Sequence, residues 1–131
     1  MKRLLIVALA LAIAAPAFAA DPVVGIWKSK PDDNGNFGYI RVAPCGARIC
    51  GVLIKSFDKA GKPMASPNIG RKIVWDMKAE GGGAYGAGKI WAPDRNQTYA
   101  SKMELKGDVL TVKGCALFGL VCRGQDWTRV K

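Results

Sequence analysis

The sequence predicts an all-β protein, an eight-stranded antiparallel up-and-down barrel with little helix once a leader segment is removed. Hydrophobic residues recur with a period of two rather than 3.6, and turn-forming residues separate the apolar segments every eight to fourteen positions. The segments are short and sequential, and a sheet of such strands exposes two unpaired edges unless it closes on itself. Closure into a barrel is therefore the expected architecture.

The first nineteen residues have the composition of a secretory signal peptide. Lys2 and Arg3 precede an apolar run from Leu4 to Ala15, which is too short to span a bilayer comfortably. Ala17-Phe18-Ala19 forms the small-x-small pattern at which a signal peptidase cleaves. We therefore expect residues 1–19 to be removed and residues 20–131 to form a single domain in the bacterial periplasm, or secreted. An uncleaved membrane anchor is the alternative, and we do not expect an integral membrane protein.

The chain is strongly basic. It has 20 Lys and Arg against 10 Asp and Glu, and loss of Lys2 and Arg3 with the leader lowers the net charge from +10 to +8. The basic residues are spread evenly, which is typical of a solvated surface, and weak attraction to anionic envelope lipid or polymer is the alternative. No aromatic-basic recognition motif is present, so nucleic acid is not an expected partner.

Four cysteines in an exported domain of this size predict two disulfides. Three pairings are formally open, and the spacing favours Cys45 with Cys50 and Cys115 with Cys122 because each pair brackets a short turn. The chain contains neither a C-x-x-C motif nor a histidine, which argues against zinc binding and thiol redox chemistry.

The eight strands are expected, in order, at residues 24–30, 37–43, 49–57, 71–78, 87–92, 97–106, 109–114 and 123–130. The first hairpin turns at Asn34-Gly35, which supplies the positive φ angles that tight turns need. Two longer segments, 58–70 and 79–86, are expected to be loops that flank one barrel mouth. The second of them carries three consecutive glycines.

An eight-stranded barrel is just wide enough either to be filled by its own side chains or to hold one small ligand, and the sequence leaves both alternatives open. In the fourth strand, Ile73, Trp75 and Met77 alternate and are expected to point inward. Aromatic side chains offer large contact areas to a ligand. The candidate ligand-lining residues are Trp75, Tyr99 and Met103 in the interior and Tyr85 and Trp91 near the mouth.

The residue types argue against catalysis and cofactor binding. The absence of histidine excludes a histidine base and the commonest metal ligand. The segment from Gly83 to Lys89 fits G-x-x-x-x-G-K, but Ile90 replaces the Ser or Thr that would bind magnesium, and the residues that follow cannot begin a helix. We therefore expect no catalytic residue, no cofactor and no metal, and a protein that is not an enzyme.

The Gly25-x-Trp27 phrase of the first strand looks like the lipocalin and calycin signature. In that family the tryptophan plugs the closed end of the barrel and an arginine from the last strand stacks over it. The resemblance implies that Arg129 takes this role, and that Gly25, Trp27, Trp127 and Arg129 close the barrel.

A larger set of phrases, in a specific order, covers nearly all of residues 24–130. They are Gly25-Ile26-Trp27, Pro44-Cys45-Gly46, Ile49-Cys50-Gly51, Gly88-Lys89-Ile90-Trp91, Pro93, Thr98-Tyr99, Gly114-Cys115 and Gln125-Asp126-Trp127-Thr128-Arg129. In these phrases the chain resembles a family of small uncharacterised bacterial exported proteins, a domain of unknown function with a lipocalin-like barrel. Ala92 departs from that pattern, because an aspartate commonly precedes the proline. The resemblance implies a fold and a compartment, and brings no established chemistry.

Three functional hypotheses from different classes follow. The leading one is a non-enzymatic, periplasmic lipocalin-like protein that holds a small apolar or amphipathic ligand in its barrel. The alternative is an envelope interaction protein with a filled barrel, whose basic surface docks on anionic lipid, polymer or a protein partner. An enzyme ranks third, and the sequence does not predict an oligomeric state.

Overall fold

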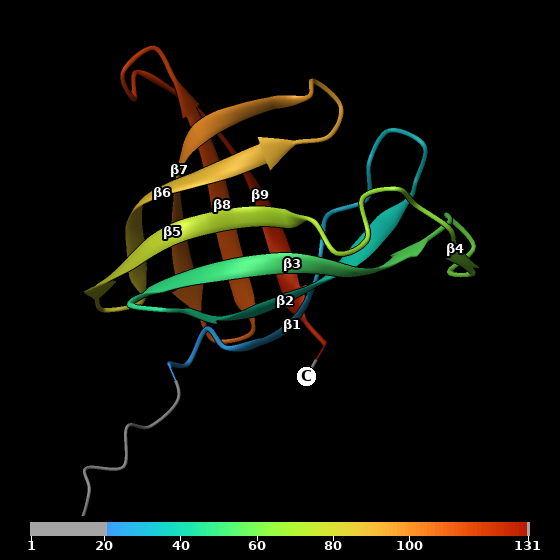
Figure 1. Cartoon of the computed structure of the whole chain (residues 1–131), viewed down its shortest axis with the longest axis horizontal. Coiled ribbons are helices and arrows are strands. Elements are labelled where there is room, and N and C mark those ends of the chain that lie inside the picture. Colours follow the sequence, from blue (N-terminus) through green and yellow to red (C-terminus); the bar gives the residue numbers. More distant parts are fainter. Residues whose placement is uncertain (1–20, 131) are drawn as a thin grey trace, which may run out of the picture.

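A computed structural model describes residues 21–130, and all of its secondary-structure elements in this range are β-strands (Figure 1). The strands are β1 (Gly25–Lys28), β2 (Phe37–Cys45), β3 (Arg48–Phe57), β4 (Pro63–Met64), β5 (Lys72–Gly81), β6 (Ala84–Ala92), β7 (Gln97–Lys106), β8 (Val109–Ala116) and β9 (Val121–Arg129). This described part contains no helix long and apolar enough to cross a membrane. The leader expected at residues 1–19 lies outside the described residues.

Eight of the strands form one closed antiparallel sheet. They pair in the order β2-β1-β9-β8-β7-β6-β5-β3, and a further pairing between β2 and β3 closes the ring. The two residues of β4 pair only with Ser56 and Phe57 at the end of β3 and stay outside the ring. The predicted all-β, eight-stranded barrel is confirmed.

The inner face of the barrel is apolar because alternate residues of each strand share a face. Trp27 lies opposite Ile40, and Val42, Gly51 and Val74 lie side by side on β2, β3 and β5. A Cβ atom at Gly51 would lie 2.9 Å from a methyl carbon of both Ile40 and Val74, so a glycine lets these strands pack closely here. The fully buried side chains are Val23, Trp27, Val42, Val74, Met77, Leu110, Val112 and Trp127.

A β-bulge changes which side chains of β5 face inward. Ile49 pairs with Met77 and Gly51 with Val74, so β5 has one residue more than β3 across this stretch. Asp76, within the bulge, adopts a left-handed φ of 56°. Val74 and Met77 are both fully buried as a result, so the expected inward alternation of Ile73, Trp75 and Met77 is right for Met77 and wrong for Trp75, whose place on the inner face is taken by Val74.

The antiparallel path divides the connections between two ends of the barrel (Figure 1). The open end carries the connections 29–36, 58–71, 93–96 and 117–120, and the closed end carries the short turns 46–47, 82–83 and 107–108 together with residues 21–24. The expected loops 58–70 and 79–86 therefore lie at opposite ends and do not flank one mouth. The second is mostly strand, with a tight turn at Gly82-Gly83 whose φ angles of 64° and 84° suit glycine.

Trp27 and Arg129 meet at the closed end, where the first and last strands pair. The Cζ atom of Arg129 lies 4.4 Å from the centroid of the Trp27 ring. The same guanidinium donates hydrogen bonds to the backbone oxygens of Pro22 (2.7 Å) and Val24 (3.3 Å). The indole Nε1 of Trp27 donates to the backbone oxygen of Val23 at 2.9 Å. These hydrogen bonds hold the segment before β1 against the closed end of the barrel.

Candidate ligand-binding cavity

A cavity of about 270 Å³ opens at the end of the barrel opposite Trp27. Its lining residues come from β6, β7, β8, β9 and the β6–β7 turn: Ile90, Ala92, Asp94, Arg95, Tyr99, Gly114, Ala116, Val121, Arg123 and Gln125. The barrel is therefore filled at its closed end and hollow at its open end.

The register of β8 and β9 explains why polar side chains enter this cavity. Trp127 is buried in the core, and alternation along β9 places Gln125, Arg123 and Val121 on the same inner face. Arg123 lies opposite Gly114, which has no side chain to occupy the space in front of it. Inward positions that would hold apolar residues in a filled barrel are polar here.

Gly114 keeps the cavity wall open. A Cβ atom at this position would lie 3.2 Å from the Cγ2 of Ile90 and 3.7 Å from the Cβ of Tyr99, which are neighbours across β6 and β7. Below this level the interior is packed: Met103, Leu110 and Val112 are all buried. These side chains form an apolar floor.

The cavity carries a net positive charge. Arg95 and Arg123 line it together with a single carboxylate, Asp94. Within residues 21–130 the ion pairs are Lys106 with Glu104 and Arg129 with Asp108, so neither cavity arginine is paired with a carboxylate. Two guanidinium groups are therefore available to an anionic ligand.

Of the five residues expected to line a ligand site, only Tyr99 lines this cavity, and its hydroxyl donates to the Oε1 of Gln97 at 2.8 Å. Met103 belongs to the packed floor. Trp75 pairs with the exposed Lys89 while the neighbouring Val74 faces the core, so Trp75 lies on the outer face.

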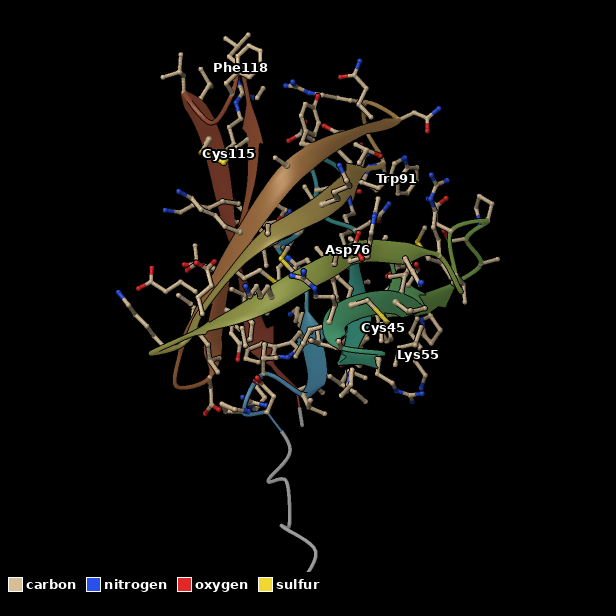
Figure 2. All side chains as sticks on the ribbon, turned by 60° about the vertical axis from the view of Figure 1, so that its left-hand side comes forward. Cys45, Lys55, Asp76, Trp91, Cys115 and Phe118 are labelled. Atoms are coloured by element: carbon tan, nitrogen blue, oxygen red, sulfur yellow. A yellow bond between two sulfur atoms is a disulfide. The ribbon has the colours of Figure 1, made fainter. Side chains whose placement is uncertain are left out.

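Trp91 and Tyr85 do not line the cavity either, although Trp91 lies at the open end, where its Nε1 donates to the Oδ1 of Asn96 at 3.1 Å. Trp91 follows the inward-facing Ile90, and on the opposite face the guanidinium of Arg71 covers its ring, with the Cζ atom 3.3 Å from the ring centroid. The labelled Trp91 lies well away from Phe118 at the tip of the β8–β9 turn (Figure 2).

Tyr85 is at the closed end, where its hydroxyl donates to the Oδ1 of Asp21. Burial, and then this hydrogen bond, raise the pKa of Tyr85 above its usual value of 10.0. This corrects the expectation that Tyr85 lies near a mouth.

Sequence reasoning missed the polar wall of β9. Arg123 and Gln125 are charged and polar, and such residues are usually assigned to solvent. The signal that could have found them is their spacing of two from Trp127, because an inward tryptophan fixes the direction of every second residue along the strand.

The structure pairs Cys45 with Cys50 and Cys115 with Cys122, the pairs that the spacing favours. The first closes the β2–β3 turn at the closed end, and the second joins β8 to β9 at the open end. Two disulfides are compatible with a location outside the cytoplasm. No group of three or more His, Cys, Asp or Glu suited to a metal ion occurs among the described residues.

A second hollow, of about 300 Å³, lies on the outer wall of the same strands, with Ala87, Ala100, Lys102 and Cys115 among its lining residues. Ala100 and Lys102 alternate with the inward Tyr99 and Met103, so this hollow lies on the outer side of the sheet. The inner cavity is the better candidate site because charged and apolar side chains from four strands of the barrel converge on it.

No curated protein matches this chain. A solved structure described as "Protein HP1028 from the human pathogen Helicobacter pylori belongs to the lipocalin family" matches with a TM-score of 0.68 and 13% identity, covering 86% of this chain and 85% of that one. At this identity the likeness is one of fold. The model of a bacterial family matches residues 25–129, which include the whole barrel. The chain therefore belongs to the family described as "Uncharacterized protein conserved in bacteria (DUF2147)", with a lipocalin-like barrel as its fold.

Proposed function

We propose that this protein is a non-enzymatic binding protein of the bacterial periplasm that holds a small amphipathic molecule, with a negatively charged group, in the open end of its barrel. The observation that carries the proposal is the inward placement of Arg123 and Gln125 above an apolar floor. The basic leader-like segment at residues 1–19 and the two disulfides support the compartment.

The chemistry of the cavity favours an anionic head group. An arginine guanidinium matches the geometry of a carboxylate or phosphate with two parallel hydrogen bonds. The side-chain amide of Gln125 adds a donor on the same inner face. Asp94 is outnumbered by Arg95 and Arg123 and would repel a second anion near the rim.

The wall between Arg123 and the rim favours the apolar part of the ligand. Ile90, Ala92, Val121 and the ring of Tyr99 contribute apolar surface to the cavity. A volume of about 270 Å³ lies just below the usual range for small-molecule sites, roughly 300–1,000 Å³. The occupant is therefore short, or leaves part of its length in solvent.

The alternative, a solid barrel that acts only through its basic surface, is less well supported because the interior is hollow at the open end. An enzyme is also less well supported: the cavity brings together no nucleophile and base, and Asp94 is its only carboxylate.

Three probes that share a ten-carbon tail test the proposal by isothermal titration calorimetry on oxidised residues 20–131. They are decanoate, decanol and decyltrimethylammonium. We expect decanoate to bind at least tenfold more tightly than the other two, because only its head group pairs with Arg123. Equal affinity for all three, tighter binding of the cation, or no binding of any probe would refute the proposal.

Two substitutions locate the site. Arg123→Gln is expected to weaken decanoate binding by about tenfold, a loss of one charge-assisted contact. Its matched control is Arg41→Gln, at an exposed position between two inward residues of β2, which should leave binding unchanged. Gly114→Val is expected to weaken the binding of all probes, because the valine side chain would occupy part of the cavity.

Native mass spectrometry of protein purified from the periplasm would identify the natural ligand class.

A further inference from the structure

The β8–β9 turn presents large apolar side chains to solvent. Phe118 is fully exposed, Leu120 is 84% exposed, Leu117 67% and Val121 48%. We call these four residues the apolar tip. Figure 2 shows Phe118 at the extremity of the molecule, directly beyond Cys115. Val121 also lines the cavity, so the tip rises from the cavity rim.

The apolar tip is held in a fixed shape. The Cys115–Cys122 disulfide crosses the base of the hairpin, where the two residues are direct partners. Leu117 and Phe118 adopt left-handed φ angles of 53° and 56°, which bulky residues rarely adopt. The backbone nitrogen of Leu120 donates to the oxygen of Leu117 at 3.1 Å across the turn. A turn that imposes this backbone on apolar residues points to a function for their exposure.

Exposed apolar side chains gather at the open end of the barrel as a whole. In the described part of the chain, eight large hydrophobic side chains are exposed, and six of them lie at this end: the four of the apolar tip, Met64 and Ile69. The other two, Val109 and Val130, lie at the closed end and are each 37% exposed. Exposed apolar side chains are therefore more numerous at the open end than at the closed end, and the apolar tip is their largest group.

We propose that the apolar tip inserts into the interface of an anionic lipid bilayer and holds the open mouth of the barrel against the membrane. A stable protein interface buries about 800 Å² on each partner, which a convex four-residue tip cannot supply. Insertion of a few apolar side chains among lipid head groups needs no complementary surface.

The charge of the protein selects anionic lipid over neutral lipid. Residues 20–131 carry a net charge of +8. Arg95 lies in the neighbouring turn of the same end, and Arg123 follows Val121 by two residues. A basic side chain near an anionic bilayer surface gains about 1 kcal/mol at moderate ionic strength. Asp94 opposes part of this attraction locally. The docking does not depend on the proposed ligand, although an anionic amphiphile would also partition into such a surface.

Vesicle flotation with oxidised residues 20–131 tests the proposal. The vesicles are phosphatidylcholine alone and phosphatidylcholine with phosphatidylglycerol at 7:3. We expect the protein to bind the phosphatidylglycerol vesicles at least tenfold more strongly. Phe118→Ser/Leu120→Ser should reduce that binding at least tenfold, since full burial of one such side chain is worth about a factor of ten. The matched control Val109→Ser, at the closed end, should change it less than twofold.

Three outcomes would overturn the proposal: no binding of the unaltered protein to phosphatidylglycerol vesicles, equal binding of Phe118→Ser/Leu120→Ser and the unaltered protein, or an equal loss in Val109→Ser. The second outcome would assign binding to diffuse charge alone. Decanoate affinity of the tip variant in vesicle-free buffer reports separately on the cavity, so failure of the ligand proposal and failure of the docking proposal are distinguishable. Quenching by brominated lipid in Phe118→Trp, compared with Val109→Trp, reports which end faces the bilayer.

Discussion

Replacing Arg129 by methionine measures the contact that joins the first and last strands. Methionine keeps much of the aliphatic stem and removes the guanidinium, which stacks on Trp27 with its Cζ 4.4 Å from the ring centroid. The substitution also removes the hydrogen bonds to the backbone oxygens of Pro22 and Val24. We expect the free energy of unfolding to fall by about 2–4 kcal/mol, roughly 1 from the cation–π contact and the rest from charge-assisted hydrogen bonds. The ion pair with Asp108 adds little because that carboxylate is 83% exposed.

A double-mutant cycle isolates the stacking. Trp27→Leu alone should cost about 2–4 kcal/mol, because it leaves a cavity in the core. Combined with Arg129→Met, the total should fall short of the sum by about 1 kcal/mol, since the stacked pair can be lost only once. Urea unfolding followed by circular dichroism, with disulfides intact, gives the four free energies. Arg41→Met, at an exposed position, is the control and should change stability by less than about 0.5 kcal/mol. Additivity within about 0.3 kcal/mol would refute the reasoning.

Three further predictions concern stability. Gly51→Ala should destabilise the barrel by about 1–3 kcal/mol, measured by urea unfolding, because its Cβ would lie 2.9 Å from two buried methyl carbons. A protein whose urea midpoint did not move would contradict this. Cys115→Ser/Cys122→Ser should cost about 2 kcal/mol through the freer unfolded chain, and a melting temperature unchanged from the oxidised protein would exclude it. Because the folded-state pKa of Tyr85 is raised, its stabilising effect is present below pH 10 and is lost as pH rises further. The free energy of unfolding should therefore decline less steeply above pH 10 in Tyr85→Phe than in the unaltered protein.

The sequence was sufficient for the barrel because its evidence is redundant. Three observations indicate the same closed sheet: hydrophobic residues alternate with a period of two, turn residues separate the segments, and matched tryptophan-containing motifs lie at the two ends of the domain. Two of the eight strands, β3 (Arg48–Phe57) and β7 (Gln97–Lys106), match the predicted spans within a single residue at each end, and the other six are off by two or three residues at one end.

The candidate site was harder to predict for two physical reasons. The bulge at Asp76 shifts the inward set of β5 by one residue, and a single extra residue reverses every later side chain of a strand. Large aromatic residues also offer the largest contact area to a ligand, yet here Trp75 and Trp91 cover the outside of the barrel and Tyr85 lies at its closed end. The cavity depends on small residues such as Gly114, and a sequence pattern does not show where a missing side chain leaves space.

The pairing of β1 with β9 determines when the barrel can close. During synthesis from the amino terminus, one edge of β1 has no partner until β9, which contains Arg129, has been made. Contacts between residues a whole chain length apart make folding slow, because a large loop must be ordered before they form. The local hairpins can form as soon as their own strands are available, but the ring of strands closes only when the last strand has joined the first.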